Sequence, residues 1–99
     1  MSFINVYLDD VRTPPNGWFL VKTAAEAIEM LSTNKVLKIS LDHDLGEEKN
    51  GSGMDVIKYI EERAYTEKGY FIPEIIIHTA NPVARQMMEM AARNIEKVR

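Results

Sequence analysis

The fold is decided by residues 36–44, which read VLKISLDHD. The branched apolar side chains of 36–41 indicate a buried β-strand, and the acids that follow end it. A polar, glycine-punctuated loop over 46–53 comes next, and then a segment at 54–65 whose apolar residues recur at helical spacing. Strands that alternate with helices are typical of parallel sheets with right-handed crossovers. The stretch therefore predicts an α/β fold.

The rest of the chain repeats this pattern of strands. Further strands are predicted at 3–8, 18–22 and 73–77, because each is short and apolar and is bounded by turn residues or charges. Residues 12–17, RTPPNG, contain two prolines and a glycine and leave no room for a helix between the first two strands. We therefore expect one parallel sheet of about four strands, in which the second strand is short.

Capping residues predict two more helices. Thr23 and Glu26 form a capping box that opens a helix after 23. Asn81 caps the last helix, and Pro82 stands at its first position, where a missing N–H costs nothing. The apolar residues of this last helix are expected to face the core; they are Val83, Met87, Met88, Met90 and Ala91.

Length and composition are those of a small globular protein. The 99 residues fit a single domain over 1–99, since domains run from about 50 to 250 residues. Without cysteine there is neither a disulfide framework nor a thiolate metal site. The start, MSFINVYLDD, lacks the basic and long apolar segments of a signal peptide. We expect a cytoplasmic location and no membrane association, because no apolar run approaches the ~20 residues of a membrane helix.

The charge distribution limits the partners. The net charge is −3, and the twelve Lys and Arg residues are scattered rather than gathered in a stripe. Because phosphate neutralisation supplies most of the affinity of nucleic-acid binders, an extended duplex footprint is not expected. A small phosphorylated ligand, or the end of an RNA, needs only one or two cations and remains open.

Chemically active residues follow three of the predicted strands. Asp9 and Asp10 follow the first strand, Asp42 the third, and His78 the fourth. The carboxyl ends of parallel strands meet at one edge of a sheet, where ligands bind. Two or three carboxylates there repel one another at ~4 kcal/mol per pair, so they share a proton or hold a cation. An all-oxygen set favours Mg²⁺ or Mn²⁺ on Asp9, Asp10 and Asp42.

Each of these residues also has a purely structural interpretation. An Asp at a strand end often bonds its own backbone in a turn. His78 is either a catalytic acid or base, a metal ligand, or a capped core histidine. His43 alternates with its acidic neighbours, so its side chain should start on the opposite face and serve a supporting role.

Candidate phosphate-binding groups surround the start of the last helix. Thr79 offers a hydroxyl, and the helix opened by Asn81 offers backbone N–H groups, which are a natural phosphate site. Arg85 lies one turn further, and its side chain leans back toward that terminus. Arg12 follows the acidic pair and is expected to face the same edge. For both arginines a surface or ion-pairing role is the alternative.

The strand-end residues resemble those of response-regulator receiver domains. Receivers carry an acidic pair after the first strand, an Asp after the third, and Thr or Ser followed by Ala after the fourth. A closer likeness covers residues 5–92: YLDDVRTPP at 7–15, LDHDLG at 41–46 and IHTANP at 77–82 resemble the cyclic-phosphate processing receiver domain family. The resemblance implies a receiver-like, flavodoxin-like sheet.

The resemblance also implies a role in processing cyclic phosphates, such as a 2′,3′-cyclic RNA end or a cyclic phosphate of ADP-ribose. The hypothesis is a Mg²⁺-dependent phosphoesterase in which Asp42 and His78 are catalytic. Residues 1–99 contain no candidate for the fifth receiver strand or for the receiver lysine, which argues against a two-component switch. The alternative is a module that senses a phosphorylated ligand, or accepts a phosphoryl group, without turnover.

Overall fold

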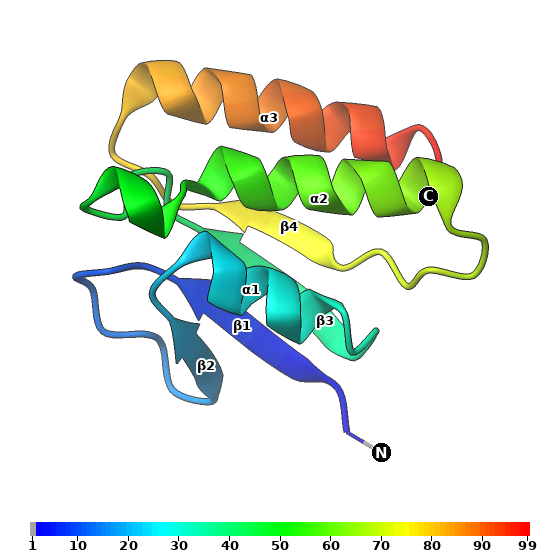
Figure 1. Ribbon diagram of the computed structural model, residues 1–99, viewed down its shortest axis with the longest axis horizontal. Coiled ribbons are helices and arrows are strands. Elements are labelled where there is room, and N and C mark those ends of the chain that lie inside the picture. Colours follow the sequence, from blue (N-terminus) through cyan, green and yellow to red (C-terminus); the bar gives the residue numbers. More distant parts are fainter. Residues whose placement is uncertain (1) are drawn as a thin grey trace.

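Four parallel strands form one sheet in the computed structural model, which describes residues 2–99 (Figure 1). The strands are β1 (Ile4–Leu8), β2 (Trp18–Val21), β3 (Val36–Leu41) and β4 (Glu74–Ile77), and their order across the sheet is β2-β1-β3-β4. All neighbouring pairs are parallel. The α/β prediction with four strands is confirmed, and the second strand is short, as expected.

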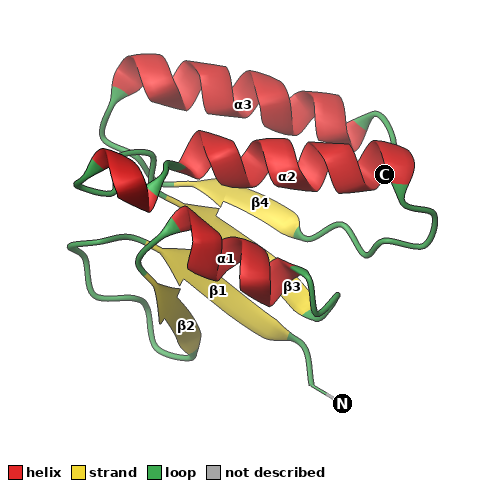
Figure 2. Ribbon diagram, in the orientation of Figure 1, coloured by secondary structure: helices red, strands yellow, loops and turns green. Residues whose placement is uncertain are grey.

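Three helices cover one face of this sheet (Figure 2). They are α1 (Ala24–Leu31), α2 (Gly53–Thr66) and α3 (Pro82–Glu96). The crossovers from β2 to β3 and from β3 to β4 run in the same direction across the sheet. Right-handed crossovers that run in one direction place their helices on one side. The return from β1 to β2 is a loop over 9–17, so no helix among the described residues covers the opposite face (Figure 1).

Polar caps begin all three helices. The predicted capping box of Thr23 and Glu26 is present at α1, and Asn81 caps α3 with Pro82 in its first turn. A second capping box, Ser52 with Asp55, opens α2 and was not predicted. The preceding loop, expected to be irregular, contains a single 3₁₀ turn at Glu48–Asn50.

The core lies between the sheet and the helical layer. Alternation along the strands turns Val6, Leu8, Ile39 and Leu41 toward the helices, where all four are buried. The residues between them have the opposite orientation. Tyr7 and Ser40 are register partners on neighbouring strands and lie on the face without helices. This face matters below, because the alternation continues beyond the strand ends to the candidate site.

The prediction for the apolar face of α3 was partly wrong. Met88 is fully buried, as expected, together with Ala84 and Ile95. Met87 and Met90 are each 57 % exposed, and Val83 is 68 % exposed. The helix has two adjacent apolar stripes at the same spacing, and only the stripe of Ala84, Met88 and Ile95 packs on the sheet and on α2. Met87 and Met90 line a shallow groove with Met54 of α2.

No helix among residues 2–99 is both long enough and apolar enough to cross a membrane.

Candidate metal and phosphate site

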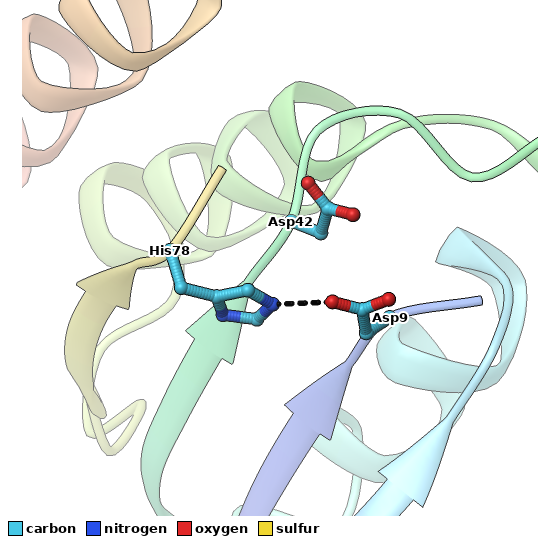
Figure 3. Close-up of side chains that lie close together, drawn as sticks. All are labelled: Asp9, Asp42 and His78. Carbon is cyan, nitrogen blue, oxygen red and sulfur yellow. Dashed lines mark hydrogen bonds and ion pairs between the residues drawn. The ribbon is translucent and has the colours of Figure 1, made fainter. Parts of the chain in front are cut away.

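Three side chains from separate strand ends meet at the carboxyl edge of the sheet (Figure 3). Asp9 follows β1, Asp42 follows β3 and His78 follows β4. Each offers one potential ligand atom, and these atoms all lie within 4.8 Å of one another. The parallel topology therefore brings together residues that are distant in the chain, as the strand-end pattern indicated.

Asp9 is held by its own turn and by His78. One carboxylate oxygen, Oδ1, accepts hydrogen bonds from the backbone N–H groups of Val11 and Arg12, both at 2.9 Å. The other, Oδ2, lies 2.9 Å from Nε2 of His78. Burial alone would raise the pKa of this carboxyl group, but the two backbone N–H groups and His78 outweigh it and lower the pKa below 3.8. Asp9 is therefore an anion, although its side chain is only 1 % exposed.

The imidazole ring of His78 is fixed on three sides. Besides Nε2 at Asp9, its Nδ1 lies 2.7 Å from the hydroxyl oxygen of Ser40. The ring of Tyr7 stacks on it, with 4.4 Å between centroids and 3° between planes. Sequence reasoning singled out neither Ser40 nor Tyr7. The available signal was position: each stands two residues before a candidate acid and therefore points to the same side of its strand.

Asp42 has one oxygen that the backbone engages. Its Oδ1 accepts a hydrogen bond of 2.8 Å from the N–H of His43, and the residue is partly exposed. A carboxylate has about four lone-pair sites, so both Asp9 and Asp42 retain capacity for a cation. Two close carboxylates and a partly open edge are chemically suited to a hard divalent ion such as Mg²⁺.

Two of the acidic-motif residues point elsewhere. The carboxylate of Asp10 lies against the loop after β3: a Cβ atom on Gly46 would be 3.2 Å from its Oδ2. Asp10 is outside the group formed by Asp9, Asp42 and His78. His43 directs Nδ1 to Oδ1 of Asp44, at 3.0 Å, and not to the other three side chains.

The polar side chains at the start of α3 accept hydrogen bonds from backbone N–H groups of the same turn. The hydroxyl of Thr79, a buried residue, accepts the N–H of Asn81 at 3.2 Å. The side-chain oxygen of Asn81 accepts the N–H groups of Val83 and Ala84, both at 3.1 Å. A phosphate at this helix terminus would have to exchange these bonds.

Two arginines flank the end of β4. Arg12 donates from Nη1 to the carbonyl oxygen of His78 at 2.9 Å, and its Nε lies 3.8 Å from Oδ2 of Asp9. Arg85 donates to the carbonyl oxygen of Thr79 at 3.3 Å and pairs with Glu89 at 3.6 Å. Both side chains are more than 40 % exposed. Arg12 therefore contacts the cluster directly, whereas Arg85 contacts the residue that follows His78.

Comparison with known proteins identifies the family of this chain. The family model described as the cyclic-phosphate processing receiver domain matches residues 4–94, from the start of β1 almost to the end of α3. No curated protein and no solved structure matches the chain. The matched range includes every residue of the site. The chain therefore belongs to the family of cyclic-phosphate processing receiver domains.

Proposed function

We propose that this domain is a Mg²⁺-dependent phosphoesterase that opens a cyclic phosphate, either the 2′,3′-cyclic end of an RNA or a cyclic phosphate of ADP-ribose. The observation that supports it most is the placement of Nε2 of His78 beside two carboxylates at an accessible sheet edge. Carboxylates that hold a cation and a proton donor for the leaving oxygen both assist metal-dependent phosphoester cleavage. Membership of a family described as cyclic-phosphate processing supports a cyclic phosphate as the substrate class.

Asp9 and Asp42 would hold Mg²⁺, or Mn²⁺ in its place, with Asp10 at the periphery of the site. The bound cation would offset charge on the phosphate oxygens and favour ionisation of a water molecule. Arg12 and Arg85 would bind the remaining phosphate oxygens with their exposed donors. Thr79 and Asn81 would contribute only if they exchange the internal bonds that they make in this structure.

His78 would supply the proton. The oxygen of a water molecule forms a bond to phosphorus, and one ring P–O bond breaks. The departing ribose oxygen takes the proton from Nε2 of a doubly protonated His78, which leaves a neutral ring with its proton on Nδ1. The water releases a proton to solvent, and solvent returns a proton to Nε2. The product is a phosphate monoester. Alternatively, a carboxylate oxygen of Asp42 attacks phosphorus while one ring P–O bond breaks and the departing ribose oxygen takes a proton. Water then cleaves the resulting aspartyl phosphate ester to the same monoester and frees Asp42.

Turnover and cation binding can be tested separately. We expect His78→Ala to abolish hydrolysis of cytidine 2′,3′-cyclic phosphate while Mg²⁺ affinity, measured by calorimetry, survives. Asp42→Asn should lose both. If His78→Ala lost Mg²⁺ binding as well, a ligand role would replace the proton-donor role.

A second candidate is a module that binds or accepts phosphate without turnover. It is favoured by the partly exposed carboxylate of Asp42, which stands at the acceptor position of receiver domains. Intact-mass measurement after treatment with acetyl phosphate and Mg²⁺ distinguishes the two. A stable phosphoryl adduct that is absent in Asp42→Asn would support the module.

A further inference from the structure

We propose that Ser40 is a positioning residue for His78: its hydroxyl holds Nδ1, so that Nε2 is the nitrogen presented to Asp9 and Asp42. The inference rests on the proposed function for its catalytic consequence, but the placement of the proton on the ring can be measured without turnover. Ser40 itself is 4 % exposed and lies on β3, two residues before Asp42.

The contact is short and is made between rigid elements. The hydroxyl oxygen of Ser40 lies 2.7 Å from Nδ1 of His78. Ser40 pairs in register with Ile76 of β4, and His78 follows two residues later on the same side of that strand. The stacked ring of Tyr7, in register with Ser40 on β1, fixes the plane of the imidazole. Backbone pairing thus presets the geometry.

The position of the proton follows from Asp9. An ionised carboxylate only accepts hydrogen bonds, so the 2.9 Å contact requires a proton on Nε2. In a neutral ring Nδ1 is then unprotonated and accepts the hydroxyl proton of Ser40. In a protonated ring Nδ1 carries a proton and donates it to the same hydroxyl oxygen. Because a hydroxyl can do either, Ser40 remains bonded throughout the transfer of the Nε2 proton.

The hydrogen bond between Ser40 and His78 matters most when another ligand engages Asp9. A cation at the carboxylates competes with His78 for Asp9, and a phosphate there competes with Asp9 for Nε2, so the hold of Asp9 on the ring weakens. Ser40 lies on the other side of the ring and is unaffected by that competition. Without it, the ring is free to rotate about its Cβ–Cγ bond, and Nε2 is no longer directed at the carboxylates.

A matched pair of variants isolates the hydroxyl. Ser40→Thr keeps it, whereas Ser40→Val replaces it with a methyl group of nearly the same size, and both residues suit a strand. Their melting temperatures show whether both fold. If the added bulk unfolds both, Ser40→Ala removes the hydroxyl without adding atoms and is compared with the parent.

The first readout is ¹⁵N NMR of the histidine rings at alkaline pH, with and without Mg²⁺. The chain has two histidines, so His43→Gln assigns the signals. The parent and Ser40→Thr should give the same pair of His78 nitrogen signals, with and without Mg²⁺. In Ser40→Val and Ser40→Ala, Nδ1 loses its hydrogen-bond partner, so both signals should shift relative to the parent and broaden when Mg²⁺ is added. An unchanged pattern in the variants without the hydroxyl overturns the proposal.

The second readout is turnover of cytidine 2′,3′-cyclic phosphate. We expect kcat to fall at least tenfold in Ser40→Val with KM nearly unchanged, and to be largely retained in Ser40→Thr. If the parent has no activity but the nitrogen signals of His78 depend on the hydroxyl, the proposed function fails and the positioning stands. If the parent is active and Ser40→Val matches it in kcat, Ser40 has no role in positioning for catalysis.

Discussion

Nε2 of His78 lies 2.9 Å from Oδ2 of Asp9, although 69 positions separate the two residues in the chain. Parallel pairing on both sides of β3 produces this contact, because β1 and β4 end at the same edge. The contact adds to the backbone N–H groups of Arg12 and Val11 in lowering the pKa of the buried Asp9 carboxyl group, and it directs one ring nitrogen at the group that would hold a cation.

The pH dependence of stability should reflect Asp9. Its pKa is lowered in the folded protein, against the penalty of burial, by the backbone N–H groups of Val11 and Arg12 and by His78. A lowered folded pKa means that the carboxylate stabilises the fold above the unfolded value of 3.8, and that this contribution is lost as pH falls through the folded value. Asp9→Asn should therefore cost roughly 1–2 kcal/mol near pH 7, and progressively less below pH 3.8.

Urea unfolding of both proteins in the presence of EDTA measures that difference across the pH range. A difference in unfolding free energy that grew on acidification would show that the sign of the pKa shift is wrong.

Asp42 should govern the response to Mg²⁺. In the parent protein, saturation at about 100 times Kd should raise the unfolding free energy by ~2.7 kcal/mol, because the cation binds only the folded state. Asp42→Asn should abolish this gain and, without Mg²⁺, should be no less stable than the parent, since one like charge is removed. Thermal scans at several Mg²⁺ concentrations provide the measurement. The control is Asp44→Asn, because the side chain of Asp44 is 66 % exposed and lies outside the cluster. An equal loss of stabilisation by Mg²⁺ in this variant would point to unspecific screening of surface charge.

Gly53 should be intolerant of a side chain. A Cβ atom at this first residue of α2 would overlap the carbonyl oxygen of Asp42 and lie 2.7 Å from Cε of Met88. Gly53→Ala should therefore destabilise the fold by about 1–3 kcal/mol despite the better helix propensity of Ala. It should also weaken Mg²⁺ binding, because the backbone of Asp42 must move. Lys58→Ala, an exposed change in the same helix, serves as the control for both readouts.

Replacement of Met88 and of Met87 in α3 should lower the unfolding free energy by very different amounts. Met88 is fully buried, so Met88→Ala should lower the unfolding free energy by about 2–5 kcal/mol. Met87 is 57 % exposed, and Met87→Ala should change the unfolding free energy by less than about 0.5 kcal/mol. Denaturant titrations of the two variants compare neighbouring residues of identical chemistry. Similar costs would mean that the helix is rotated relative to the orientation described here.

Local sequence patterns were sufficient to predict the strands and helices of this fold. Short apolar runs, capping residues at Thr23 and Asn81, and the prolines of the 12–17 loop each leave a signal within a few residues. Parallel topology then carried the prediction to the strand ends and brought Asp9, Asp42 and His78 to one edge. Such inference needs only the direction of the strands.

What escaped prediction depends on contacts between elements. The pairing of Ser40 with His78 requires the register of β3 on β4, which no local pattern gives. The turning of Asp10 toward Gly46 depends on the path of a loop. The inward face of α3 was ambiguous because two apolar stripes fit the same helical spacing, and only packing against α2 and the sheet selects one.

The most direct test of the central claim is ³¹P NMR of two substrates with protein and Mg²⁺: a nucleoside 2′,3′-cyclic phosphate and ADP-ribose 1″,2″-cyclic phosphate. We predict that at least one cyclic phosphate signal is replaced by that of a monoester, and that Asp42→Asn and His78→Ala each prevent the conversion. The position of the monoester identifies the oxygen that leaves. If neither substrate is converted while Mg²⁺ binding is demonstrated separately, the claim of an enzyme is contradicted and the phosphate-binding module takes its place.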